Sequence, residues 1–147
     1  MIDNDSFAQI NQNTIQDNSQ RGISFQGQSG GNASENQIYR NGYGSNGRDY
    51  WQGIGIEDNA SPTLNSNIIK ENAAAGIQFI DNSGGAAANN QLIGNSVNYA
   101  TYKQDLNRSQ ISAGGIVVGM YGRQMAAQPS IGDNVFEGNM GGELNRY

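Results

Sequence analysis

The chain has 147 residues, of which 35% are hydrophobic, so it is long enough for one domain with a modest apolar core. Its net charge is −5 and its pI is near 4.4, so it lacks the basic field that attracts nucleic acid or anionic lipid, and we expect neither partner. Cysteine and histidine are absent, which excludes disulfides, thiolate chemistry and histidine as a general base or metal ligand.

Five copies of one pattern of apolar residues and asparagines follow one another along the chain. Each copy begins with an apolar residue, has asparagines three and eight residues later, and has a second apolar residue between them. In chain order the copies are Ile10-Asn13-Ile15-Asn18, Ala33-Asn36-Ile38-Asn41, Leu64-Asn67-Ile69-Asn72, Ala87-Asn90-Leu92-Asn95 and Ile131-Asn134-Phe136-Asn139. The uninterrupted repeat is 23 residues, as between Asn13 and Asn36.

A glycine and two alternating apolar residues follow each of the first four copies. They are Gly22-Ile23-Ser24-Phe25, Gly53-Ile54-Gly55-Ile56, Gly76-Ile77-Gln78-Phe79 and Gly115-Ile116-Val117-Val118, and in the fifth copy only Leu144 clearly keeps its place. Apolar residues with period two indicate short strands, and frequent glycine and asparagine disfavour helix. Because one such unit cannot bury its apolar face alone, successive copies should stack at about 4.8 Å per turn of a solenoid.

Copies such as "SPTLNSNIIKENAAAGIQFID" and "PSIGDNVFEGN" resemble the right-handed parallel β-helix repeats of pectate-lyase-like proteins, and in particular those of bacterial alginate C5-epimerases. The resemblance covers the chain from about Ile10 to Leu144. It implies an all-β, single-stranded right-handed parallel β-helix of about five rungs with loop insertions, as one domain over residues 1–147. Many carbohydrate-active and structural proteins share this repeat, so it is specific for the fold and weak for the function.

The repeated asparagines have two interpretations. As a binding site, they would be ligands for sugar hydroxyls or calcium. As structural residues, they would form ladders at corners, where asparagine tolerates the left-handed conformation and its amide can bond the backbone or the next rung. Five copies in one register fit ladders better than a site, so we predict that the asparagines are structural.

Two insertions leave the predicted solenoid at the same corner, between the second asparagine and the glycine. The asparagine and the glycine are four positions apart in the first and third copies, but twelve positions apart from Asn41 to Gly53 and twenty from Asn95 to Gly115. Because an uninterrupted rung separates them, we expect the two insertions to project side by side with the third rung as the floor of a notch.

Aromatic and charged residues are concentrated around this notch. The candidate substrate-binding residues are Tyr43, Arg48, Tyr50, Trp51, Lys70, Glu71, Tyr99, Tyr102, Lys103 and Arg108. Tyrosine and tryptophan offer faces on which a sugar ring can stack, and arginine or lysine can pair with a uronate carboxylate. The same residues could instead cover an exposed corner or contact another subunit, and the sequence leaves these alternatives open.

No catalytic residue can be assigned from the sequence. The alginate epimerases that the repeats resemble place catalysis at an Asp-Pro-His motif, and this chain has no such motif. We therefore expect it to be non-catalytic by itself, with polysaccharide lyase or epimerase activity as the alternative. Asp58 and Asp81 follow successive predicted strands and could approach one another, which leaves calcium open as a cofactor although the ligands are few.

Two functions follow from these observations. The leading one is a β-helix that recognises a carbohydrate, in particular an acidic polysaccharide, and by the resemblance alone it would be extracellular or at the cell surface. The alternative is a structural element of a fibre, phage tail or surface adhesin. Neither end shows an amphipathic capping segment, so we expect either a piece of a longer solenoid or a protomer whose ends are covered by partners, in a homo-oligomer such as a trimer or in an end-to-end stack. The longest near-apolar run, residues 113–122, is too short for a membrane span, and residues 1–20 lack signal-peptide features.

Overall fold

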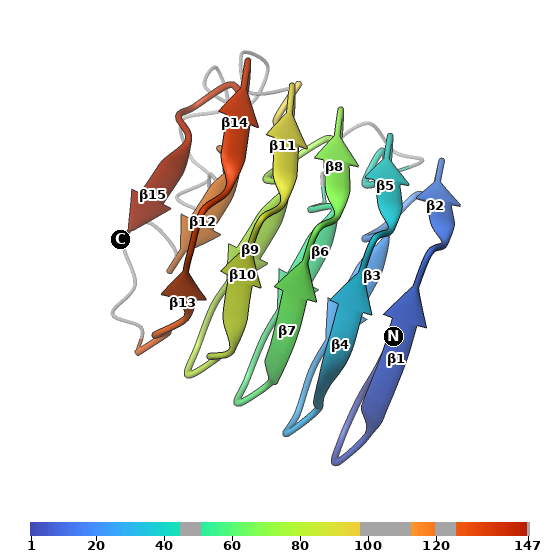
Figure 1. Cartoon of the computed structure of the whole chain (residues 1–147), viewed down its shortest axis with the longest axis vertical. Helices are drawn as coiled ribbons and strands as arrows, with labels where there is room; N and C mark the ends of the chain where they lie inside the picture. The colour runs from blue at the N-terminus through green and yellow to red at the C-terminus, as the bar shows by residue number, and fades with distance from the viewer. Residues whose placement is uncertain (45–50, 98–112, 120–125, 147) are drawn as a thin grey trace.

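The computed structural model describes residues 1–44, 51–97, 113–119 and 126–146, and the regular structure in these ranges is entirely β (Figure 1). The strands form three five-stranded sheets in which all neighbours are parallel. Three consecutive strands make one rung, and five rungs follow one another from the blue N-terminal end to the red C-terminal end (Figure 1). The chain is a right-handed parallel β-helix, as the sequence predicted.

Each sheet takes one strand from every rung. The first sheet contains β1 (Phe7–Asn11), β4 (Gly30–Ser34), β7 (Ser61–Asn65), β10 (Ala86–Ala88) and β13 (Ser130–Ile131). The second contains β2 (Thr14–Gln16), β5 (Gln37–Tyr39), β8 (Ile68–Lys70), β11 (Gln91–Ile93) and β14 (Val135–Glu137). The third contains β3 (Ile23–Phe25), β6 (Ile54–Ile56), β9 (Ile77–Phe79), β12 (Ile116–Val118) and β15 (Leu144–Arg146).

The five copies of the sequence repeat occupy the same columns of these sheets. Ile10 pairs with Ala33 in the first sheet and Ile15 with Ile38 in the second. The fifth copy keeps this register, since Phe136 pairs with Leu92 and Leu144 with Ile116. Within the described ranges, no helix has the length and apolar character needed to cross a membrane.

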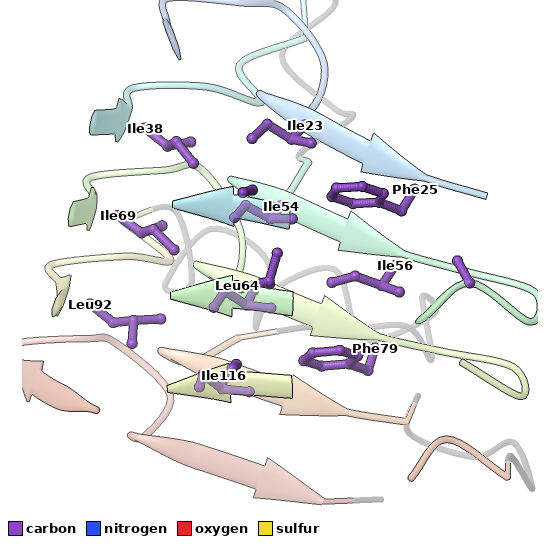
Figure 2. Close-up of a cluster of buried hydrophobic side chains, with 14 of the residues drawn as sticks. Ile23, Phe25, Ile38, Ile54, Ile56, Leu64, Ile69, Phe79, Leu92 and Ile116 are labelled. Carbon is purple, nitrogen blue, oxygen red and sulfur yellow. The ribbon is translucent and has the colours of Figure 1, made fainter. Parts of the chain in front are cut away.

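The apolar residues form a continuous core enclosed by the three sheets (Figure 2). Phe25 and Phe79 are fully buried, and each is followed eight residues later by a buried alanine. In the rung between them, the smaller Ile56 is followed after the same interval by Leu64. Large and small side chains thus compensate one another, which allows a narrow core to be filled at native density.

Two columns of asparagines run along the solenoid beside this core. The Oδ1 atom of Asn67 accepts the backbone N–H (3.0 Å) and the Nδ2 (2.9 Å) of Asn36, while its own Nδ2 donates to the Ala33 carbonyl at 2.8 Å. The first column contains Asn13, Asn36, Asn67, Asn90 and Asn134, and the second contains Asn18, Asn41, Asn72, Asn95 and Asn139. The predicted structural role of the asparagines is therefore confirmed, because their buried amides are satisfied by the neighbouring rungs.

The left-handed conformation lies one residue earlier than the sequence indicated. Gln12 (φ 58°), Arg40 (φ 51°) and Glu71 (φ 53°) adopt it, each directly before a ladder asparagine. The prediction that the asparagines themselves are left-handed is wrong. The left-handed residue turns the chain at an exposed position. Because of this turn, the asparagine that follows points into the corner, where its amide oxygen and N–H groups bond to the neighbouring rungs.

Close packing against the next rung explains the repeated glycine before the third sheet. A Cβ atom at Gly76 would lie 2.8 Å from the carbonyl oxygen of Gly115 and 2.8 Å from the Leu92 side chain. A Cβ at Gly53 would lie 2.8 Å from Nδ2 of Asn72. In the first four rungs this column must therefore be glycine, because the asparagine ladder and the next rung leave no space for a side chain; the last rung has Glu143 there.

Candidate functional site

The two described loop bases flank the third rung, as the sequence predicted. The carbonyl of Trp51, at the end of the first insertion, accepts the N–H of Ala74 at 3.1 Å. On the other side the N–H of Ser96, at the start of the second insertion, donates to the carbonyl of Ala74 at 2.9 Å. Because Ala74 is buried, the floor of the expected notch is filled at this point. The accessible part of the third rung lies three to four residues earlier, at Lys70, which is partly buried, and Glu71, which is exposed.

Tyr43 lies over this exposed part of the third rung. Gly42 places it there with a φ of 89°, and a Cβ at Gly42 would lie 2.1 Å from the carbonyl oxygen of Trp51, so glycine is required at the turn. The Tyr43 hydroxyl donates to the Glu71 carbonyl at 3.0 Å, while its ring stays partly exposed. Partial burial, together with the Glu71 charge, raises the pKa of Tyr43.

Tyr39 is a second aromatic residue at this corner, and it is not among the candidates that the sequence pattern indicated. The Arg40 guanidinium lies 4.8 Å from the centroid of its ring and the Lys70 ammonium lies 5.1 Å from it. Tyr39 and Lys70 face each other in register on β5 and β8, so the solenoid stacks the cation on the ring. Only the register reveals this contact, because the two residues are 31 positions apart in the chain.

Arg40 connects this aromatic residue to the first rung. Its Nε and Nη2 atoms each donate to one carboxylate oxygen of Asp17 at 2.8 Å, and both side chains are about half exposed. These bonds from Arg40 hold the pKa of Asp17 below its ordinary value. Lys70, by contrast, has no ion-pair partner among the described residues, so its charge remains available to a ligand.

A shallow depression of about 300 Å³ lies against this corner. It is lined by Asp17, Asn18, Ser19, Arg40 and Tyr43. We call the surface formed by the depression together with Tyr39, Lys70 and Glu71 the corner surface. It combines aromatic faces, two cations, two carboxylates and small polar groups, which are the types of group that bind sugars.

Trp51 lies elsewhere, although it belongs to the same insertion as Tyr43. The guanidinium of Arg21 lies 4.8 Å from its ring centroid, and Arg21 also forms an ion pair with Glu57 and a 2.9 Å hydrogen bond to Gln52. The Arg21 side chain crosses Gly55 on the outer side of the third sheet, where a Cβ would lie 2.5 Å from its Nε. One face of Trp51 is therefore already occupied by Arg21.

Arg48, Tyr50, Tyr99, Tyr102, Lys103 and Arg108 lie outside the described residues. Of the ten candidates, the structure thus locates Tyr43, Lys70 and Glu71 at one corner and Trp51 beside Arg21.

Asp58 and Asp81 approach one another on neighbouring rungs, as the sequence suggested. Oδ2 of Asp58 accepts the N–H of Gly27 at 2.9 Å, and Oδ2 of Asp81 accepts the N–H of Asp58 at 3.3 Å. Each carboxylate therefore bonds the backbone of the preceding rung, in the same way as the ladder asparagines. No group of three or more acidic side chains that could hold a metal ion occurs in the described ranges.

Comparison with known proteins gives one match. A family model described as "Right handed beta helix region" matches residues 1–136. No curated protein and no solved structure matches the chain.

Proposed function

The chain belongs to the right-handed β-helix family, and on that basis we propose that it is a carbohydrate-recognising β-helix whose binding site is the corner surface. The fold is often carbohydrate-related, and the resemblance of the repeats to pectate-lyase-like proteins and alginate epimerases supports the same proposal. Because one fold serves many functions, the residues of the corner surface must carry the argument.

The observation that carries the proposal is the arrangement around Tyr39 and Tyr43. Tyr43 and Arg40 line a depression of about 300 Å³, which is at the lower end of the size of small-molecule sites, and Tyr39 lies next to it with Arg40 and Lys70 over its ring. Sugar rings stack on tyrosine faces, and their hydroxyls bond carboxylates and amides such as those of Asp17 and Asn18.

An acidic polysaccharide fits this surface better than a neutral one. Lys70 has no ion-pair partner among the described residues and lies over the Tyr39 ring, where it can meet a uronate carboxylate. The net charge of −5 opposes long-range attraction of a polyanion, so the proposed recognition is local and depends on this lysine. The proposal therefore includes a location outside the cell or at its surface, where the protein would meet such a ligand.

We propose binding without catalysis by this chain alone. The Asp-Pro-His motif of the epimerases that the repeats resemble is absent from the sequence. If the chain were an active lyase on uronate polymers, the unsaturated product would absorb in the ultraviolet, and we expect no such absorbance. Calcium is not required in this proposal, since Asp58 and Asp81 bond backbone groups.

A glycan array that includes uronate polymers and matched neutral glucans tests the proposal. We expect binding to one or more uronate polymers, weaker binding to the neutral glucans, and loss of the uronate preference in Lys70→Ala. Gln91→Ala is the matched control, because Gln91 is an exposed residue on the outer face of the same sheet. Uronate binding that survives both Lys70→Ala and Tyr43→Ala unchanged would show that the corner surface is not the site.

Trp51→Ala tests the contribution of the first insertion separately. Since one face of Trp51 contacts Arg21, the substitution removes at most the other face from a ligand. A loss of binding in Trp51→Ala that is larger than the loss in Lys70→Ala would move the site from the corner surface to the outer side of the third sheet.

A structural role in a fibre, phage tail or surface adhesin is the second candidate function. The observation that favours it is the distribution of exposed apolar side chains. In the described part of the chain they gather on the first rung or the segment before it, at Met1 and Phe7, and on the last rung, at Val135, Met140 and Leu144; Tyr43 and Val97 are the exceptions.

A further inference from the structure

We propose that the last rung of one copy of this chain binds the first rung of a second copy, so that copies stack head to tail along the solenoid axis. This inference concerns the second candidate function. The two proposals share Asn18, which lines the depression of the corner surface and begins the second ladder. Assembly is measured without a carbohydrate, so either proposal can fail while the other holds.

The first rung has unused hydrogen-bond acceptors at its free face. In the described ranges, Oδ1 of every inner ladder asparagine accepts two hydrogen bonds from the rung before it. Asn13 and Asn18 begin the two ladders, and their Oδ1 atoms accept none in the part of the chain that the structure describes. Both atoms therefore face a position where a further rung would donate.

The last rung has the matching donors. Backbone N–H groups of the ladder asparagines donate to the Oδ1 atoms of the next rung, as Asn90 does to Asn134 at 2.9 Å. The N–H groups of Asn134 and Asn139, which end the ladders, have no acceptor within the described residues. When two copies stack in register, Asn134 donates to Asn13 of the second copy and Asn139 donates to Asn18.

The backbone at the two faces is complementary in the same way. The carbonyl of Asn13 and the N–H of Asp17 bond to the second rung. In a parallel strand the backbone groups of alternate residues point to opposite neighbours, so the N–H and C=O of Thr14 and Gln16 point to the free face. On the last rung the N–H of Val135 points back to Asn90, so Phe136 has its backbone groups on the free side. Strand β14 of one copy can therefore pair with β2 of the next and continue the second sheet.

The apolar columns also continue across such a contact. Ile10 and Ile15 on the first rung, and Ile131 and Phe136 on the last, pack on the core from one side and are only partly buried. In the stacked register Ile131 covers Ile10 and Phe136 covers Ile15. The contact would thus bury these four side chains as fully as the side chains at the same positions of the inner rungs are buried.

A second copy is the occupant that the two faces specify together. Any further rung could cover one of them, and in a longer solenoid the neighbouring rung of the same chain would do so. A second copy brings the donors of its last rung and the acceptors of its first rung together in a single contact, in the register that the inner rungs already use. The contact is heterologous, and because it continues the solenoid along its axis it leads to linear assembly instead of a closed ring.

The N-terminal segment occupies part of the free face of the first rung, and this gives a specific test of the proposal. Ile2 already lies beside Phe25, with its N–H bonded to the Ser24 carbonyl at 2.8 Å. In the stacked register Arg146 of the other copy, which belongs to the same column as Phe25, would take this position. Stacking must displace one of these two segments, so a chain that begins at Ser6 should assemble more readily than the full chain.

Sedimentation velocity of the 147-residue chain over a wide concentration range tests the proposal first. We expect the mass to rise from 15.7 kDa with increasing concentration, and electron microscopy to show rods of one solenoid width. The chain that begins at Ser6 should reach the same degree of assembly at a concentration about tenfold lower. A full chain that stays at the monomer mass throughout would overturn the proposal.

Variants that block one face distinguish head-to-tail stacking from other contacts. Gln16→Pro removes an N–H from the free face of the first rung, and Leu144→Glu places a charge on the last rung, where Leu144 is 40% exposed. Each variant alone should stay monomeric, and an equimolar mixture should form dimers, because the intact last rung of one meets the intact first rung of the other.

Circular dichroism and thermal unfolding show whether each blocked variant is folded. A second pair of blocks is Ile15→Glu on the first rung and Phe136→Glu on the last, since both side chains pack on the core from the free faces. Thr63→Lys is the matched control, since Thr63 is exposed on the outer face of the middle rung and should leave assembly unchanged. Dimers formed by either single variant, or no dimers in a mixture of folded variants, would contradict a head-to-tail contact.

Discussion

The side-chain oxygen of Asn90 accepts both the backbone N–H (3.0 Å) and the side-chain Nδ2 (2.9 Å) of Asn67 in the rung before it. Both residues are fully buried. One amide oxygen therefore satisfies two donors that are buried at the corner. The two corresponding donors of Asn90 are satisfied in turn by Oδ1 of Asn134 in the next rung. The stability of the solenoid depends on the register of these columns as well as on its apolar core.

Asn67→Ala should lower the free energy of unfolding by about 3 kcal/mol or more, because it leaves buried donors and acceptors of two rungs unpaired. Asn13→Ala is the control from the same ladder, since Asn13 is exposed and its oxygen accepts no hydrogen bond in the described ranges; we expect a loss of about 1 kcal/mol. Urea unfolding measures both. Equal effects of the two substitutions would argue against a cooperative buried ladder.

Gly76→Ala should destabilise the chain by about 1–3 kcal/mol, because the new methyl group would lie 2.8 Å from both the Gly115 carbonyl and the Leu92 side chain. Gly84→Ala is the matched control, since the nearest atom to its added Cβ, Oγ of Ser61, lies 3.6 Å away. We expect that variant to be neutral or slightly stabilising. Thermal unfolding of the two variants provides the comparison, and a tolerated Gly76→Ala would contradict the packing argument.

Asp17 should titrate below its ordinary pKa of 3.8, because Arg40 donates two hydrogen bonds to its carboxylate. The contribution of this pair to stability is complete above that pH and is lost as the pH falls through the lowered pKa. In Arg40→Ala, a carboxyl NMR titration should show the pKa of Asp17 shifted upward. Arg146→Ala is the control, and an Asp17 titration that is the same in both variants would remove Arg40 as the cause.

Tyr43→Phe should weaken carbohydrate binding at the corner surface by a factor of up to about tenfold. The ring that would stack on a sugar remains, but the hydrogen bond to the Glu71 carbonyl that holds it is lost. Tyr43→Ala removes the ring as well and should have the larger effect. Calorimetric titration with a uronate oligosaccharide measures both variants, and equal affinity of wild type and Tyr43→Ala would exclude Tyr43 from the site.

Most of the fold could be predicted from the sequence because each solenoid column appears in it as a repeated residue type. The alignment of Ile15 with Ile38, and of Asn36 with Asn67, follows from spacing alone and is the register of the sheets. The corner surface was predicted only in part. Lys70 and Glu71 were selected because an insertion lies on either side of their rung, whereas Tyr39 has no local signal.

The sequence by itself determined the architecture, since a solenoid converts a period along the chain into contacts between neighbouring rungs. Only the tertiary structure decided which outward side chains meet. Tyr43 turns to Glu71 on the third rung, while Trp51, from the same insertion, packs on Arg21 of the first. The inward residues are constrained by burial and by buried hydrogen bonds, so they repeat; the outward ones are not, and their contacts depend on loop conformations that no repeat records.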